Sequence, residues 1–141
     1  MEALDSLLEL QHDRLLQLQA ILAKEKQAVL HKEADILLRL CGEKATLLDQ
    51  IKTHDQNMAH HPKKNLLQSQ PDLIHKLQLS KQLLAQCQQL NTENAHLVAF
   101  NQASLNRLSQ ALQVSRNASS LTYNDKGKTS TLSSLGNNIK V

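Results

Sequence analysis

The stretch from Pro71 to Val114 contains no glycine and no further proline. Its apolar residues recur at the period of an α-helix and fall on one side of a helical wheel. These residues are Leu83, Leu84, Cys87, Leu90, Leu97, Val98, Leu105, Leu108 and Leu112. Pro71 suits the first helical turn, where its missing N–H removes no hydrogen bond, and Asp72 suits the positive end of the helix dipole. We therefore predict an amphipathic helix over about residues 71–115.

This helix is unusual in its polar residues. Asn91, Asn94 and Asn101 lie within the apolar stripe, and between Gln82 and Asn106 the only formally charged residue is Glu93. A helix that packs only within its own chain usually carries charged pairs on its exposed side. The pattern predicts a surface that another chain covers. Asparagines at such positions usually pair or fix the register of neighbouring helices, and ligand binding in a groove is the less common alternative.

A second amphipathic pattern occupies the N-terminal part of the chain. Apolar residues recur every seven positions at Leu8, Leu15, Leu22, Val29 and Ile36. After Ile36 the pattern steps by four to Leu40, a stutter that locally unwinds a supercoil. Gly42 follows and costs about 1 kcal/mol in a helix interior relative to alanine. Because the pattern resumes at Leu47, we predict one helix over about residues 3–55 with a kink near Gly42.

The two predicted helices are joined by a loop over residues 56–70, in which Pro62 prevents a continuous helix. Leu66 and Leu67 predict one turn of helix or an apolar contact across the hairpin end. From Ser115 onward, serine, threonine, asparagine and glycine dominate, and so few apolar residues do not offset the entropy of ordering. We predict an all-α fold: a long antiparallel, coiled-coil-like hairpin within residues 1–115, with a flexible tail over 116–141. A two-helix hairpin has a thin core, so a third element, self-association or a partner must cover the rest.

Composition argues against several classes of function. The net charge is +3, and the basic residues approach a cluster only at Lys63-Lys64 and near Lys126, so we expect no nucleic-acid partner. The acidic N-terminus has no signal-peptide pattern and no membrane-spanning run, which predicts a cytoplasmic protein with free cysteines. His54, His60 and His61 lack the partners of a tetrahedral metal site. No catalytic constellation is present, so we predict no enzyme, no metal and no cofactor.

Phe100 points about 120° away from the centre of the apolar stripe. Two interpretations are equally weighted. Another part of this chain or a second copy covers the ring, or the ring anchors a different partner.

Several features together resemble the FlgN family of flagellar type III export chaperones. They are the small size, the long N-terminal helix, the proline-broken loop, the Gln/Asn-rich second helix and the C-terminal sequence. That sequence runs Leu121-Thr122-Tyr123-Asn124-Asp125-Lys126-Gly127-Lys128-Thr129-Ser130. The family often has glycine directly after the tyrosine. Here Asn124 takes that place, and asparagine also tolerates left-handed backbone.

The resemblance implies a chaperone that binds the hook–filament junction proteins FlgK and FlgL, prevents their premature assembly and hands them to the export gate protein FlhA. It implies that Tyr123, with Asn124 and Gly127 in the following turn, contacts the gate. We expect the client surface on the second helix, at Leu90, Leu97, Val98, Phe100, Leu105, Leu108 and Leu112. A homodimer remains open, and the alternative function is a self-assembling structural coiled-coil protein.

Overall fold

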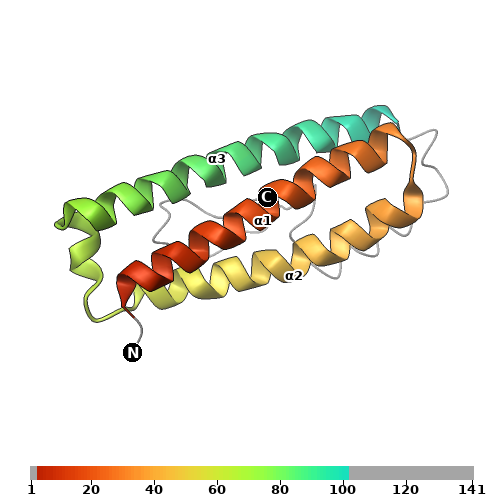
Figure 1. The fold of residues 1–141 in the computed structure, drawn as a ribbon. Helices are drawn as coiled ribbons and strands as arrows, with labels where there is room; N and C mark the ends of the chain where they lie inside the picture. The colour runs from red at the N-terminus through yellow and green to blue at the C-terminus, as the bar shows by residue number, and fades with distance from the viewer. Residues whose placement is uncertain (1–2, 102–141) are drawn as a thin grey trace.

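The computed structural model describes residues 3–101, which form three long helices and one short 3-10 helix (Figure 1). Helix α1 spans Leu4–Leu30, α2 spans Ala34–Ala59, η1 spans Lys64–Gln68 and α3 spans Pro71–Phe100. Residues 3–101 contain no strand, and the predicted all-α class is confirmed. Within this part of the chain, no helix is long and apolar enough to cross a membrane.

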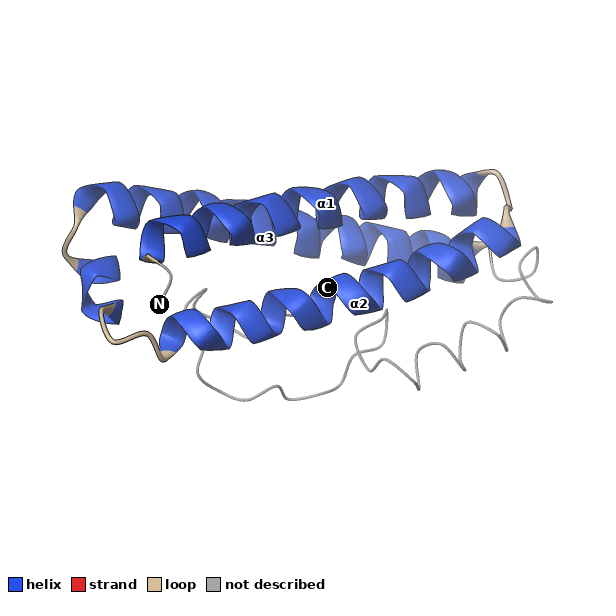
Figure 2. Cartoon of the chain, turned by 60° about the horizontal axis from the view of Figure 1, so that its bottom comes forward, coloured by secondary structure: helices blue, strands red, loops and turns tan. Residues whose placement is uncertain are grey.

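The three helices lie side by side, and α1 packs against both of the others. The chain runs along α1, returns along α2, and turns through η1 into α3 (Figures 1 and 2). Helix α3 is therefore parallel to α1 and antiparallel to α2. The expected two-helix hairpin is replaced by a three-helix bundle, in which the third helix supplies the core that two helices would lack.

The prediction of one helix over residues 3–55 is wrong, because the chain turns at residues 31–33. Lys32 adopts a left-handed backbone with φ of 56°. The N–H of Glu33 donates to the carbonyl of Ala28 at 2.8 Å, and the N–H of Lys32 donates to that of Val29 at 3.1 Å. This pair of bonds is the Schellman motif, which ends a helix and usually places glycine where Lys32 stands. Gly42, where a kink was expected, lies inside α2.

The connection between α2 and α3 follows the sequence more closely. Helix α2 ends at Ala59, three residues before Pro62. The predicted turn of helix is η1, and its Leu67 is buried against the core. Helix α3 begins at Pro71 as predicted, while its expected continuation to residue 115 and the tail over 116–141 lie outside the described residues.

The buried apolar side chains form two clusters. The larger cluster unites all three helices and η1 through Leu4, Leu8, Leu15, Leu18, Leu22, Leu47, Leu48, Ile51, Met58, Leu67, Leu73, Leu77, Leu83, Leu84 and Cys87. The smaller cluster lies next to the α1–α2 turn and contains Ala28, Val29, Leu37, Leu40 and Cys41. We call the end of the bundle that holds this turn the distal end. The end of α3 lies there too, because α3 is parallel to α1.

The turn provides a direct stability test. Replacing Lys32 by glycine should raise the free energy of unfolding by about 0.5–1 kcal/mol, because glycine adopts left-handed backbone without the steric cost that a Cβ carries. The matched control is Lys24→Gly, at an exposed position inside α1, where glycine should cost about 1 kcal/mol. Urea denaturation followed by circular dichroism would measure both, and equal losses of stability would contradict the assigned turn.

Candidate partner-binding surface

One flank of the bundle, where α1 meets α3, is defined by two hydrogen-bonded pairs. Lys76 Nζ donates to Glu9 Oε1 at 3.0 Å, and Gln19 Nε2 donates to Gln86 Oε1 at 3.3 Å. In both pairs the α3 residue number exceeds the α1 number by 67. The same offset of 67 residues places three further pairs of apolar residues at matching heights along the bundle: Leu16 with Leu83, Ala23 with Leu90, and Leu30 with Leu97.

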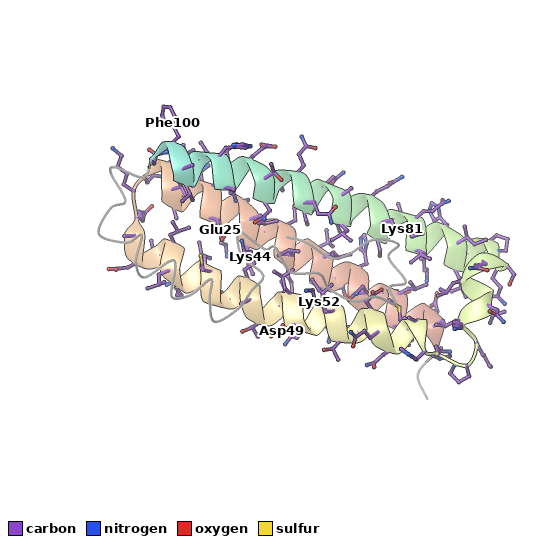
Figure 3. The ribbon with its side chains drawn as sticks, turned by 180° about the vertical axis from the view of Figure 1, so that it is seen from behind. Glu25, Lys44, Asp49, Lys52, Lys81 and Phe100 are labelled. Atoms are coloured by element: carbon purple, nitrogen blue, oxygen red, sulfur yellow. The ribbon has the colours of Figure 1, made fainter. Side chains whose placement is uncertain are left out.

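The distal end of this flank exposes large apolar side chains. Phe100 is 88% exposed, and Leu30, the last residue of α1, is 47% exposed. Leu97 is half-buried and packs against the smaller apolar cluster. Figure 3 shows Phe100 projecting from the end of α3, away from the other helices. We call Leu30, Leu97 and Phe100 the distal patch, a set of apolar residues at this end of the bundle that a partner could cover.

The structure places four of the seven expected client-binding residues. Leu90 is half-buried against the larger cluster, and Leu97 and Val98 against the smaller one. Phe100 is 88% exposed. Leu105, Leu108 and Leu112 lie outside the described residues, as do Tyr123, Asn124 and Gly127.

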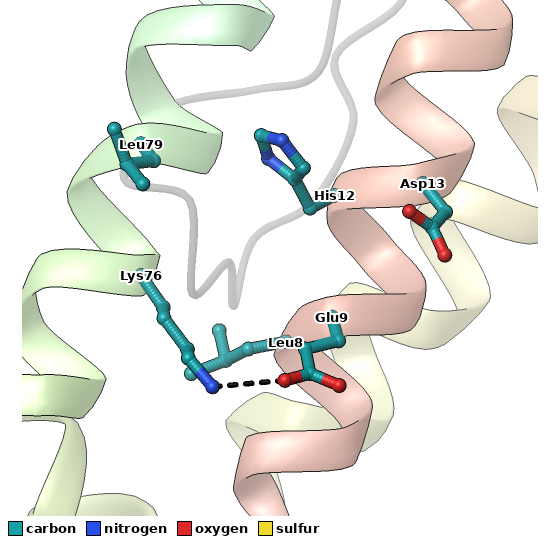
Figure 4. A pocket seen from close by; sticks show the side chains of 6 residues that line it. All are labelled: Leu8, Glu9, His12, Asp13, Lys76 and Leu79. Carbon is teal, nitrogen blue, oxygen red and sulfur yellow. Dashed lines mark hydrogen bonds and ion pairs between the residues drawn. The ribbon is translucent and has the colours of Figure 1, made fainter.

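A hollow of about 320 Å³ opens on the same flank, toward the other end of the bundle (Figure 4). Leu8, Glu9, His12 and Asp13 of α1 line it, with Lys76 and Leu79 of α3. Lys76 closes one end by pairing with Asp5 and Glu9, and these two carboxylates raise the pKa of its amine. The amine therefore stays charged at any pH near neutrality. The remaining wall combines Leu8 and Leu79 with His12 and Asp13, and its leucine part suits an apolar or aromatic group.

A buried polar layer separates the two apolar clusters. Glu25 on α1 and Lys44 on α2 form an ion pair, with Lys44 Nζ 3.2 Å from Glu25 Oε2, and both side chains are fully buried (Figure 3). Lys44 also donates to Asn91 Oδ1 on α3 at 2.9 Å, so the layer links all three helices. Beside it, the buried Asn94 donates to the Leu22 carbonyl at 2.8 Å. These asparagines bond across to α1 and α2, in line with a role in fixing register.

The buried thiols and the buried His54 of the described residues take part in hydrogen bonds within the bundle. Cys41 and Cys87 are buried and form no disulfide, as the sequence predicted, and burial raises the pKa of the Cys87 thiol to about 12. A thiol with so high a pKa is a poor nucleophile near neutral pH. Residues 3–101 contain no group of three or more metal-binding side chains, and His54 instead bonds to the Leu7 carbonyl at 2.6 Å. The geometry supports binding of another chain.

Sequence reasoning missed Leu30 and the whole flank of α1. The sequence does contain a pattern that indicates this flank: a second row of residues in α1, spaced alternately three and four positions apart. It comprises Glu9, His12, Leu16, Gln19, Ala23, Lys26 and Leu30. This row carries apolar residues outside the main apolar stripe. In the predicted single helix over residues 3–55, the same row would have faced solvent. The buried pair of Glu25 and Lys44 had no signal, because both residue types normally face water.

The buried layer gives a second prediction. Glu25→Leu should lower the free energy of unfolding by about 3–5 kcal/mol, because it leaves the Lys44 amine buried without its counter-charge. Adding Lys44→Met to this variant should recover most of the loss. The control is Glu43→Ala, which removes the exposed Arg39–Glu43 pair of α2 and should cost less than about 0.5 kcal/mol. A double variant no more stable than Glu25→Leu alone would show that the pair is not the source of the effect.

The comparisons with known proteins agree with this arrangement. A family model described as FlgN protein matches residues 1–131, which is nearly the whole chain. No curated protein and no solved structure matches. The matched range includes all three helices and the distal patch. The protein therefore belongs to the FlgN family, and its general role is that of a flagellar export chaperone, which binds export substrates.

Proposed function

We propose that this protein binds hook–filament junction proteins of the FlgK and FlgL type, prevents their premature assembly and delivers them to the export gate protein FlhA in the cytoplasm. The observation that carries the client-binding step is the exposure of Phe100, whose side chain is 88% exposed at the end of α3, at the same end of the bundle as the exposed Leu30. An aromatic side chain held in water by a rigid helix is the type of residue that dominates binding energy when a partner covers it.

The physical mechanism is the docking of a helix. A client segment that self-assembles through amphipathic helices can lay its apolar face along α3 in place of another client molecule. The distal patch supplies the apolar anchor. Leu90 and Val98, which are half-buried, supply the partly accessible wall. The sequence stripe through Leu105, Leu108 and Leu112 would lengthen this contact, and we include it in the proposed client surface.

Delivery to the gate is proposed for the segment around Tyr123. A tyrosine presents a rigid apolar ring and one hydroxyl at little cost in side-chain entropy. Asn124 and Gly127 favour a turn that would present the ring. A tyrosine in so polar a segment fits contact with a second partner after the client is bound.

The alternative function, a self-assembling structural coiled-coil protein, predicts different solution behaviour. A chaperone should form a monomer or dimer and a complex of defined stoichiometry with a client segment. A structural protein should form larger assemblies as concentration rises. Size-exclusion chromatography with light scattering separates these outcomes.

Phe100→Ala tests the client surface. Because the side chain is exposed, its truncation should change the melting temperature little. Binding to the C-terminal helical segment of a junction protein should weaken by about 1–3 kcal/mol, the scale for burying one large apolar side chain. Leu10→Ala is the control, since Leu10 is 40% exposed on α1 and lies outside the distal patch. A Phe100→Ala variant that melts several degrees lower and binds normally would place the ring in the core.

Tyr123→Ala tests delivery to the gate. Helicity and client binding should be unchanged, while docking of the client-loaded chaperone to the purified FlhA domain should be lost. Isothermal titration calorimetry measures both interactions, and secretion of the junction proteins should fall in parallel. Unchanged docking of the loaded variant would overturn the assigned role of Tyr123.

A further inference from the structure

The outer face of α3 carries an exposed stripe without any charged Lys, Arg, Asp or Glu. Its residues alternate at spacings of three and four, and all eight are exposed: His75, Gln78, Gln82, Ala85, Gln89, Thr92, His96 and Ala99. We call these residues the outer stripe. This spacing is that of the contact positions of a coiled coil, and it lies opposite the side of α3 that packs into the bundle. A long helix face without charge is expected where another helix covers it.

Two exposed apolar residues flank the outer stripe on one side. Leu79 is 40% exposed, Phe100 is 88% exposed, and they belong to one row of α3 with Gln86 and Glu93 between them at seven-residue intervals. Leu79 lines the hollow of about 320 Å³ between α1 and α3 (Figure 4). Phe100 lies three heptads further along, about 30 Å away at 1.5 Å per residue, and projects into solvent. Within residues 3–101, the same flank therefore carries an open apolar hollow and an exposed aromatic ring.

We propose that two copies of this chain associate through their outer stripes as antiparallel helices, with Phe100 of each copy in the hollow beside Leu79 of the other. In an antiparallel helix pair the same flank of both helices meets, so the row from Leu79 to Phe100 faces its own counterpart. The twofold axis of such a dimer repeats each contact. Both rings are then covered and both hollows filled.

The register set by this contact is supported by the sizes of the residues that it brings together. With Phe100 opposite Leu79, the facing pairs across the outer stripe are Gln82 with Ala99, Ala85 with His96, and Gln89 with Thr92. Each pair joins a longer side chain to a shorter one, which lets the two helices interdigitate. No like charges face each other, because the outer stripe contains no Lys, Arg, Asp or Glu. Shifting one helix by a heptad places Gln78 opposite His96 and removes the ring from the hollow.

This self-complementarity selects a second copy as the occupant of the outer stripe. The inference goes beyond the proposed function, since it requires no client, and it gives Phe100 a use before a client arrives. A stripe of amides and small residues buries little apolar surface, so the dimer is reversible and the two Phe100 anchors supply most of its stability. A client that binds Phe100 would displace the second copy.

Cysteine crosslinking tests the register. A mixture of Gln82→Cys and Ala99→Cys chains should form a disulfide-linked dimer under mild oxidation, because these two positions face each other. Neither variant alone should crosslink, since the two copies of each position lie about 25 Å apart in the proposed dimer. The matched control is a mixture of His75→Cys and Ala99→Cys, whose positions are offset from a facing pair by one heptad, about 10 Å along the helix axis. The native cysteines are buried, and the wild-type chain provides the background.

Each outcome decides the proposal. Crosslinking restricted to the first mixture supports it. Absence of crosslinking in a mixture that stays monomeric at about 100 μM, crosslinking of either variant with itself, or crosslinking in the control mixture overturns it. In sedimentation equilibrium, Phe100→Ala and Leu79→Ala should each raise the dimer dissociation constant at least tenfold, whereas Leu10→Ala should leave it unchanged.

The two proposals fail in distinguishable ways. Intact crosslinking without client binding would overturn the proposed function and leave the dimer standing. Client binding by a chain that never crosslinks would overturn the dimer alone.

Discussion

The contact on which this bundle depends is the ion pair between Glu25 and Lys44, extended by Asn91. Two fully buried charges are stable only when they face each other, because an unpaired charge in the interior costs several kcal/mol. Since Glu25, Lys44 and Asn91 come from three different helices, this requirement fixes the relative height of all three at once. Apolar contacts alone would tolerate a shift of one heptad, because leucines on neighbouring turns are interchangeable. The polar layer thus provides the register, and the leucine clusters on either side of it provide most of the stability.

The position of α1 explains which surfaces remain for partners. Because α1 packs on both α2 and α3, most of its apolar residues are buried within the bundle. Helix α3 uses one side for the core and leaves its outer face without charge. The α1–α2 turn ends α1 at Leu30, so no further turn of α1 covers the side of α3 at Phe100. The distal patch is therefore a direct result of where the turn lies, and the same patch serves both the client and the second copy in our proposals.

Parts of the fold could be predicted from residues whose effect is local. Pro71 begins α3 because its ring suits the first turn, and Pro62 follows the end of α2 because it cannot continue a helix. The turn at residues 31–33 could not be predicted in the same way, because Lys32 gives no sign of the left-handed backbone that it adopts. The seven-residue apolar pattern continues across this turn, because the two helices that the turn joins both bury apolar residues in the bundle. For the candidate site, Phe100 was found from its angle on the wheel, whereas Leu30 was not, because its exposure depends on the end of a helix that the pattern did not reveal.

The amino-acid sequence by itself determined the helical class, the apolar face of each helix and the uncharged character of α3, because periodicity and side-chain type act within a few turns of the chain. It also carried the resemblance to the FlgN family, through the order of its helices and loop and through the C-terminal sequence around Tyr123. Only the tertiary structure decided that Glu25 and Lys44 are buried, that α3 runs parallel to α1, and that Leu30 and Phe100 are exposed at the same end of the bundle. These features depend on residues far apart in the sequence being held at the same height in the bundle. Which residues face each other is set by the packing of the helices and by the cost of burying charge. Neither of these can be deduced from the sequence of a single helix.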